Sequence, residues 1–548
     1  MNPWLIGASL LYLGGSYVWR KLHEKETPRE RPPAVALPRS DEGAAIPFVC
    51  GRYRVRSPIL AYDGKQFAVS VPTDSGFVGA SLDSAPERYI YLKSLHFVIG
   101  IPMSNGEGTS RLHAMWVGTQ KMGNSGTVAV DQFTGDGNFE SRTLGRFVFD
   151  SIYEPDYPYN SAVERDDDSK HLYPFQAEVE WLNGNPDQKV LDDDDTPLTF
   201  LGKHMTVTTS LQSEGYRDFS GAIPAAQTPS YRGFLSVFLH HDGSDDGALR
   251  QYALLGGESL QAPSFEVSDY QFNHADLGTY AKVLFEANPA NVIFTILTHP
   301  KMCGLAESQI DIPSFQDVQY VLYSEKHGYS RSFEDGQTAE EMLGDVLQQI
   351  NGVLWQDRAT GKLKLRLIRN DYNPATIPVI DRSNCTSLDM DSIGSEDLPN
   401  KVRITFRNRD KDYETDSVTA QDLASVFAGG KTREVVIDYP GCCSANQAQG
   451  LADRELADLS RPLMTGTALV SRELYRLAPG DAVMVRWTSP DIASIVFRVT
   501  SIDYGTLEQS AIRLGLVQDS GYVYRARTPQ PGGFGGFTPP SPPIDVFG

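Results

Sequence analysis

Short runs in which apolar and polar residues alternate, separated by turn-forming residues, occupy most of this chain. Alternation with a period of two puts the apolar side chains on one face of a strand, so each run is typical of a half-buried β-strand. Clear examples are residues 52–56, 89–92 and 235–239. Because strands must pair into sheets and bury their apolar faces, the pattern predicts a mainly β fold with small α+β parts.

The length of the chain predicts several domains. Its 548 residues exceed what a single hydrophobic core usually serves. Polar stretches at 164–170 and 188–196 interrupt the strands of the first half and are typical of surface loops or insertions. We therefore expect a β-rich domain over residues 40–255 that carries inserted loops or an inserted domain.

An α+β domain is expected over residues 256–375, where the pattern changes to helical spacing. Thr338 and Glu341 stand three residues apart, as in a capping box, and apolar residues recur at helical intervals after them. Gly352 lies where a helix would stop. These signals predict a helix over 338–351.

A β-hairpin is predicted directly after this helix, over residues 353–369. Its two apolar runs are separated by turn-forming residues at 357–361. The second run alternates leucines with basic residues, so one of its faces is expected to be buried.

A small β-barrel is predicted over residues 376–525. Alternating runs recur from Val402 onward, with turn residues between them. One helix is expected inside this domain, over 446–459, because Ser444 and Gln447 have capping spacing and apolar residues follow.

Both ends of the chain differ from its body. The first 22 residues contain an uninterrupted apolar run at 4–18, and residues 23–39 form a charged, proline-rich linker. The run lacks the layout of a secretory signal and is shorter than the roughly 20 residues of a spanning helix. A helix buried in an oligomer or against a partner and a membrane-active segment both remain open. Residues 526–548 form a Pro/Gly-rich tail with spaced aromatics, typical of a linker or of a segment that docks on a partner.

The charge of the chain argues against nucleic acid as a specific partner. Lys and Arg number 49 against 70 Asp and Glu, which gives a net charge of −21. Proteins that bind a duplex need a basic face for its phosphates. The acidic balance instead suits a protein that meets other proteins.

The five cysteines predict neither a disulfide framework nor a metal centre. No two of them have C-x-x-C spacing, and the adjacent Cys442 and Cys443 cannot form a disulfide of ordinary geometry with each other. We therefore expect reduced thiols, folding in a cytoplasm, and no cofactor.

Two loop motifs resemble ligand sites but lack residues that the chemistry needs. Residues 430–432 (GKT) match the end of a phosphate-binding loop, yet Ser425 stands where its first glycine should be. Residues 242–247 match the opening of a calcium loop, yet Ala253 replaces the glutamate that completes the oxygen shell. Both segments are interpreted as solvated loops.

Acidic and histidine clusters offer no better candidate. Residues 192–195 are four consecutive aspartates, typical of a solvated loop with at most a weak divalent-ion site. His240 and His241 are adjacent, which places their rings on opposite sides of a strand. The sequence has no H-E-x-x-H or G-x-S-x-G motif and no cysteine in a nucleophile setting. We predict no catalytic, cofactor-binding or metal residues and no enzyme activity.

Several motifs in the second half occur in a fixed order. They are NGVLWQD at 351–357, GKLKLRLIR at 361–369, NKVRITF at 400–406 and LAPGD at 477–481, together with residues 296–305, 308–315, 338–343 and 438–440. In this order and spacing, the stretch from about 290 to 520 resembles the tail-tip (baseplate) hub proteins of long-tailed bacteriophages, a group that includes lambda-like and gene-transfer-agent hubs. Residues 42–51 resemble the start of the first ring domain of that family.

The resemblance implies a structural virion protein. Hubs of this kind are homotrimers that close the distal end of the tail tube, with two tube-like β domains in each subunit. They contact the distal tail tube proteins, hold the end of the tape-measure protein and carry fibres or spikes for host attachment. The genome passes through their channel, for which an acidic protein is suited because it does not trap phosphates. We expect a tail-tip protein that is made and assembled in the host bacterial cytoplasm.

The ends of the chain receive roles from the same resemblance. Lambda-like members continue into receptor-binding modules, whereas this chain stops soon after its last expected strand. We therefore expect a separate fibre or spike protein, with residues 528–548 as its candidate anchor. Residues 4–18, gathered in a trimer, are expected to form a plug or to contact the tape-measure end, and to meet the host membrane on ejection.

Two other functions fit parts of the sequence. One is a tail-associated hydrolase that acts on cell-wall or surface glycan during entry, for which only residues 100–255 leave room. Its carboxylate pair would be spatial, so the sequence leaves this alternative open. The other is a secreted or membrane-tethered bacterial β protein, which rests on residues 4–18 alone.

Overall fold

The computed structural model describes residues 45–520 with internal gaps, of which the longest are 72–87, 125–146, 151–174, 185–230 and 241–252. Strands dominate the described residues and form several sheets, so the predicted mainly β fold with small α+β parts is confirmed. The predicted end segments 1–22, 23–39 and 526–548 lie outside the described residues. So do the loops at 192–195 and 242–247, and His241.

A five-stranded antiparallel sheet opens the fold, in the order β16-β1-β13-β6-β7. The strands are β1 (Phe48–Val55), β6 (Arg111–Val117), β7 (Gln120–Lys121), β13 (Pro263–Asp269) and β16 (Arg331–Phe333). Strand β13 is buried along its whole length between β1 and β6. The predicted boundary after residue 255 would separate β13 from both neighbours, so we propose a boundary after Asp269.

A nine-stranded sheet packs beside the first. Its main path is β2-β5-β11-β10-β12-β4-β3, and β8 and β9 attach to β10. The rings of Phe97 on β5 and Phe265 on β13 lie 6.0 Å apart, which places the two sheets in contact. The strands are β2 (Ile59–Asp63), β3 (Phe67–Val71), β4 (Arg88–Lys93), β5 (Leu95–Gly100), β8 (Gly123–Asn124), β9 (Phe147–Asp150), β10 (Phe175–Leu182), β11 (Leu235–His240) and β12 (Ala253–Leu255).

Three helices and two hairpins form the middle of the molecule. The elements are β14 (Lys282–Val283), β15 (Glu286–Ala287), α5 (Pro289–Thr298), η4 (Glu307–Gln309), α6 (Ile312–Ser324), α7 (Ala339–Ile350), β17 (Gly352–Gln356) and β18 (Leu363–Leu367). Their hydrophobic core also contains Phe48 and Cys50 of β1. The helical unit and the five-stranded sheet therefore share one core.

Helix α7 begins where the sequence predicted and ends slightly differently. The Thr338 side chain accepts a hydrogen bond from the Glu341 backbone N–H, and the Glu341 carboxylate accepts one from the Thr338 N–H, which completes the predicted capping box. At the other end, Asn351 takes the left-handed conformation (φ 51°) and Gly352 already belongs to β17. Asn tolerates this conformation better than most residues, so it ends the helix in place of the predicted glycine.

The cap of α7 gives a first testable prediction. Replacing Thr338 with Ala removes the acceptor of the first turn and should lower the free energy of unfolding by about 1 kcal/mol, as measured by urea denaturation. Ser444 is the matched control, because it is the N-cap of α9 (Ala445–Leu459) but makes no side-chain capping bond. Ser444→Ala should be close to neutral; equal losses for the two variants would contradict the assignment.

The last part of the chain forms two sheets where one β-barrel was predicted. A six-stranded sheet runs β19-β25-β26-β27-β24-β20 and, in the described residues, does not close. A three-stranded sheet, β22-β21-β23, is inserted between β20 and β24 and packs against α9. The elements are β19 (Val379–Ile380), β20 (Cys385–Ser392), β21 (Lys401–Asn408), η5 (Arg409–Lys411), β22 (Glu414–Gln421), α8 (Leu423–Gly429), β23 (Glu434–Asp438), β24 (Met464–Ser471), η6 (Arg472–Leu474), β25 (Ala482–Val485), β26 (Ile495–Asp503) and β27 (Ala511–Gln518).

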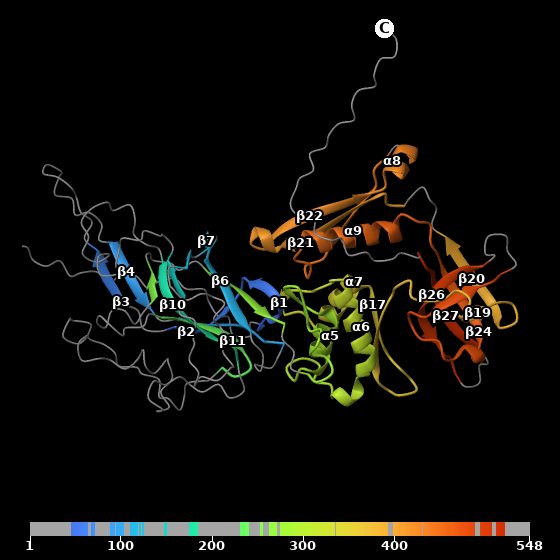
Figure 1. Ribbon diagram of the computed structural model, residues 1–548, viewed down its shortest axis with the longest axis horizontal. Helices are drawn as coiled ribbons and strands as arrows, with labels where there is room; N and C mark the ends of the chain where they lie inside the picture. The colour runs from blue at the N-terminus through green and yellow to red at the C-terminus, as the bar shows by residue number, and fades with distance from the viewer. Residues whose placement is uncertain are drawn as a thin grey trace, which may run out of the picture.

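The units follow one another along the long axis of the molecule (Figure 1). The sheets of the first half lie at one end, helices α5, α6 and α7 in the middle, and the six-stranded sheet at the other end. The three-stranded sheet and α9 lie alongside the middle and reach back toward β1. Among the described residues, no helix has the length and apolar character needed to cross a membrane.

Candidate functional site: a charged junction between three units

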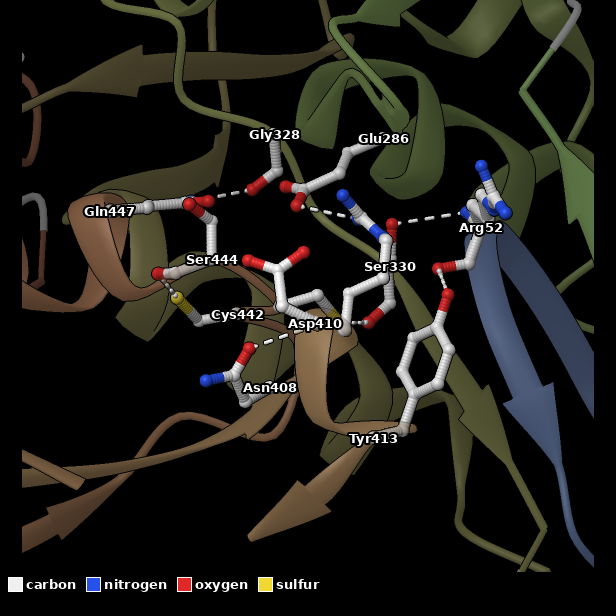
Figure 2. Close-up of polar contacts among 12 residues, drawn as sticks. Arg52, Glu286, Gly328, Ser330, Asn408, Asp410, Tyr413, Cys442, Ser444 and Gln447 are labelled. Carbon is white, nitrogen blue, oxygen red and sulfur yellow. Dashed lines mark hydrogen bonds and ion pairs between the residues drawn. The ribbon is translucent and has the colours of Figure 1, made fainter. Parts of the chain in front are cut away.

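The turn between β21 and β22 reaches the five-stranded sheet and creates a buried polar contact there. The Tyr413 hydroxyl lies 2.8 Å from Glu266 Oε1 and 3.2 Å from the Arg52 carbonyl oxygen. Arg52 Nε donates to the same Glu266 oxygen at 2.8 Å. In Figure 2 the Tyr413 ring, which comes from the turn between β21 and β22, points toward Arg52 on β1. We call the group that meets here the junction: Arg52, Glu266, Glu286, Ser330, Arg409 and Tyr413.

Backbone strain accompanies this contact. Asp412 and Tyr413 both have positive φ, 53° and 62°, although neither is a glycine. A non-glycine residue in the left-handed region costs about 1 kcal/mol or more, and such strain persists only where surrounding contacts fix it. Here the contacts of Tyr413 with Glu266 and Arg52 supply that fixation, so the turn is shaped by the unit it touches.

A second buried ion pair joins the same turn to the helical unit. Arg409 Nη2 donates to Glu286 Oε1 at 2.9 Å, and both side chains are largely buried. Burial raises the pKa of Glu286 above its ordinary value, although Arg409 acts in the opposite direction. For Glu266 the balance is reversed, because Arg52 and Tyr413 outweigh burial and lower its pKa. Burial therefore decides the direction of the pKa shift of Glu286, and the contacts with Arg52 and Tyr413 together decide that of Glu266.

Main-chain hydrogen bonds continue the connection beside these charges. The Ser330 N–H donates to the Gly441 carbonyl at 3.0 Å, and the Ser330 hydroxyl accepts from the Arg52 N–H at 3.1 Å. Gln447 on α9 donates its side-chain N–H to the Gly328 carbonyl at 2.7 Å (Figure 2). Gln447 therefore bridges two units and does not cap its own helix, which corrects the capping predicted from its spacing to Ser444.

Glycine at position 441 is required by the closeness of this contact. A Cβ atom there would lie 2.1 Å from Cε2 of the buried Tyr329 ring. Gly328 is confined in the same way, because its Cβ would lie 2.5 Å from Glu286. The backbone of Gly441 thus packs directly against the Tyr329 ring, and the backbone of Gly328 packs against the Glu286 side chain.

Arg454 on α9 ties the inserted sheet to the end of α7. Its guanidinium donates to the carbonyls of Gln349 and Gln348 at 2.7 and 3.3 Å. These carbonyls belong to the last turn of α7, where the helix dipole favours a cation. The Arg454 side chain is only 4% exposed and also pairs with Glu455, so this contact is part of the interior.

The polar groups of the junction form hydrogen bonds and ion pairs that join the units. Burial raises the pKa of the thiols of Cys442 and Cys443, which keeps them protonated and weakly nucleophilic. All five cysteines are free thiols. In the described part of the chain, no three His, Cys, Asp or Glu side chains gather as metal ligands would.

The rejected phosphate-loop motif lies away from the junction. The residues before it form the short helix α8, with Phe427 85% exposed, where the motif would need a buried strand. The Lys431 carbonyl accepts a hydrogen bond from Asn400, and β23 follows. This context is a surface connection between β22 and β23.

An exposed apolar tip lies next to the junction. Strands β14 and β15 are joined by the two-residue turn of Leu284 and Phe285, whose side chains are 62% and 56% exposed. Leu284 has a φ of 56°, in a turn position where glycine or asparagine is usual. The Arg409 guanidinium lies 5.7 Å from the Phe285 ring. Two large apolar side chains held in a strained, exposed turn indicate a contact surface.

The junction could not be proposed from the sequence. Tyr413 and Glu266 are 147 residues apart, and Arg409 and Glu286 are 123 apart. The one local signal is the pair Asp412–Tyr413, a turn without glycine between two alternating runs. In an acidic chain with many surface charges, that signal does not stand out.

Comparisons with known proteins find similarity to phage tail proteins. Residues 338–502 match a family described as putative phage tail protein. No curated protein matches the chain. A chain of the virion of the native gene transfer agent (GTA) particle aligns over 94% of this chain and 96% of its own, with a TM-score of 0.50 and 15% identity.

Two further structures align over shorter stretches. The tail protein from Neisseria meningitidis MC58 covers 64% of this chain and 90% of its own, with a TM-score of 0.31 and 10% identity. The 43 kDa tail protein of prophage MuSo2 from Shewanella oneidensis covers 54% and 76%, with a TM-score of 0.27 and 12% identity. Residues 338–502 thus resemble a phage tail protein family, and the fold over the aligned part of the chain is similar to that of the gene transfer agent chain.

Proposed function

We propose that this protein is a structural component of the virion tail of a bacteriophage or a related particle. The observation that carries the proposal is the family match over residues 338–502. This region contributes Arg409, Tyr413 and Gly441 to the contacts that join it to the first half of the chain. The proposed function therefore involves the whole body of the molecule.

In its finer form, the proposal is a trimeric hub at the distal end of the tail tube. The hub would adapt the tube to fibres or a spike, contact the end of the tape-measure protein and take part in channel closure and genome delivery. The likeness to the gene transfer agent chain, which extends over nearly the whole of both chains, supports this form at the level of fold. The domain limits predicted from the sequence, with the first moved to Asp269, belong to the same proposal.

The junction supports a mechanical role. Rigid transmission of load between units requires contacts that are short and directional. The contacts between Tyr413 and Glu266, Arg409 and Glu286, and Ser330 and Gly441 all have this character. Nothing in the described residues favours the alternative of a glycan hydrolase.

The end segments keep their proposed roles. Residues 4–18 would contact the tape-measure end or the host membrane, and residues 528–548 would anchor a fibre or spike protein. Deletion of 528–548 should leave hub assembly intact and remove the next tail component; its retention on purified tails would count against the anchor.

The oligomeric mass of the purified chain tests the proposed trimer. A variant of the exposed turn at Leu284 and Phe285 tests which surface forms it. We expect a trimer in light scattering with detergent present, and we propose that Leu284 and Phe285 contact a neighbouring subunit. The double variant Leu284→Asn, Phe285→Ser should keep or raise the thermal stability of the single chain, because Asn suits a positive φ. The same variant should shift the mass toward the monomer.

Two results would contradict this use of the tip. A variant with the parent's trimeric mass would place Leu284 and Phe285 outside the subunit contact. A variant that loses thermal stability would show that the tip serves the fold of the single chain. A parent chain that is monomeric both alone and on isolated tail tubes would overturn the trimeric hub itself.

A further inference from the structure

Helix α6 presents exposed tyrosines to solvent. Tyr320 and Tyr323 are 58% and 45% exposed, one turn apart on the helix. Both rings contact Tyr280, with centroids 5.7 and 4.8 Å away and interplanar angles of 68° and 45°. Asp317, also exposed, lies one turn before Tyr320. We call Tyr280, Asp317, Tyr320 and Tyr323 the tyrosine face (helix α6 in Figure 1).

Such a face suits a proline-rich segment. Polyproline II segments dock on aromatic side chains because they are already extended and lose little entropy on binding. Tyrosines set at angles offer both ring faces and hydroxyls to such a ligand. The acidic residue beside them would attract a basic residue that flanks the prolines.

The chain itself contains this ligand in its C-terminal tail. Residues 539–543 read PPSPP, and residues 530–538 before them are rich in glycine and aromatics. Arg525 and Arg527, which lie 14 and 12 residues before Pro539, have the sign needed opposite Asp317, whereas Asp545 after the prolines does not. The tail therefore has both the proline-rich segment and basic residues ahead of it.

A series of polar contacts links the C-terminal end of α6 to the end of the described chain. Arg369 donates to Glu325, two residues after Tyr323, at 2.7 and 2.8 Å. The Arg369 carbonyl accepts a hydrogen bond from Arg498. Arg498 Nε in turn donates to Asp519 Oδ2 at 2.7 Å. Three polar contacts thus connect the end of α6 with Asp519, one residue before the end of the described chain.

The tail supplies a linker ahead of its prolines. Pro539 lies 19 residues after Ser520, and a flexible glycine-rich chain of that length has an r.m.s. end-to-end distance of about 24 Å. An intramolecular ligand on such a linker acts at an effective concentration on the order of millimolar, so a weak contact suffices.

We propose that residues 539–543 dock on the tyrosine face of the same chain. This goes beyond the proposed function, because it gives the tail a fixed place on the body before any other tail component binds. A tail held in this way is ordered in advance, which lowers the entropy cost of its later use as an anchor.

Photo-crosslinking in the full-length chain tests the docking. p-Benzoylphenylalanine replaces Tyr320, or Ser324 in a second variant in case the first disturbs the helix. Mass spectrometry of peptides from mixed isotope-labelled and unlabelled chains then identifies the crosslinked segment and shows whether it belongs to the same chain. We expect crosslinks to residues 528–548 of the same chain from both positions. Tyr475, 55% exposed on the six-stranded unit, is the control position and should give no such crosslink.

Changing the tail provides the second arm. Replacing Pro539, Pro540, Pro542 and Pro543 by Ala together should abolish the tail crosslink from position 320 while the fold is unchanged. Crosslinks to residues 23–39, to a second copy or to no peptide would overturn the proposal. An undiminished tail crosslink in the proline variant would also overturn it, because contact would not then depend on the prolines.

Discussion

Replacing Arg409 with Met should lower the free energy of unfolding by about 3–5 kcal/mol. Methionine keeps much of the apolar stem but removes the charge that faces Glu286 at 2.9 Å. The Glu286 side chain is only 6% exposed, so the variant leaves a buried carboxylate without its partner. Urea denaturation, followed by the transition that includes the helical unit, measures the loss. A loss below about 1 kcal/mol would show that water reaches Glu286 and replaces the arginine.

The pH dependence of this loss follows from the pKa of Glu286. Burial already raises that pKa above its ordinary value of 4.5, and removing Arg409 removes the main group that lowers it. A carboxyl with a raised folded-state pKa contributes stability that is present below its unfolded pKa and is lost as pH rises through the folded value. The difference between Arg409→Met and the parent should therefore be larger at pH 8 than at pH 5.

A double variant separates charge from packing. With Glu286→Gln added to Arg409→Met, no unpaired charge remains, so most of the stability should return and the pH dependence of the difference should disappear. If the double variant is as unstable as Arg409→Met, the loss lies in the packing of the arginine stem.

Local signals of the sequence predicted local structure well. The capping box of Thr338 and Glu341 determined where α7 begins, because both partners lie within one turn. Val402, Ile404 and Phe406 alternate in the sequence and are fully buried in β21. These successes share one property, which is that the residues that decide the structure are neighbours in the chain.

Contacts between distant residues escaped prediction for the opposite reason. Strand β13 pairs with β1 across more than 200 residues, so its membership of the first sheet has no local signature. The three-stranded sheet was expected as part of one barrel, because its strands alternate in the same way as those of β26 or β27. The alternation of apolar and polar residues identifies a strand, but it does not give the register of that strand or the strand with which it pairs.

The junction combines both limits. Its charged residues are ordinary in a chain with 119 formally charged residues other than histidine, 49 basic and 70 acidic. What distinguishes Glu286 and Arg409 is burial. Gly328 and Gly441 leave room beside them for the Glu286 side chain and the Tyr329 ring. Only the folded arrangement reveals that these glycines are required.

Replacing Gly441 with Ala should lower the free energy of unfolding by about 3 kcal/mol. The added methyl group overpacks a rigid contact, so side chains or backbone must shift to admit it. The new methyl carbon would lie 2.1 Å from Cε2 and 2.5 Å from Cζ of Tyr329. The Tyr329 ring is 1% exposed, and its backbone pairs with Ala287. The hydrogen bond from Ser330 to Gly441 holds the two backbones together, so neither side can retreat without losing it. Thermal and urea denaturation measure the effect.

Gly344 is the matched control for the glycine itself. It lies in α7 and faces open space where a Cβ atom would be. Gly344→Ala should therefore raise the free energy of unfolding by up to about 1 kcal/mol through helix propensity. Stability equal to the parent in Gly441→Ala would mean that the Tyr329 ring does not lie against residue 441.

The clash also predicts a specific coupling. Tyr329→Leu removes the ring atoms that the new methyl group at position 441 would meet, at the cost of a cavity in the core shared with Phe48 and Phe333. Adding Gly441→Ala to Tyr329→Leu should therefore cost much less than adding it to the parent, with a coupling energy of about 1–3 kcal/mol. A methyl group at position 441 that meets only Tyr329 should cost little once that ring is removed. If the free-energy losses of Gly441→Ala and Tyr329→Leu simply add, the strain lies elsewhere in the 439–443 turn.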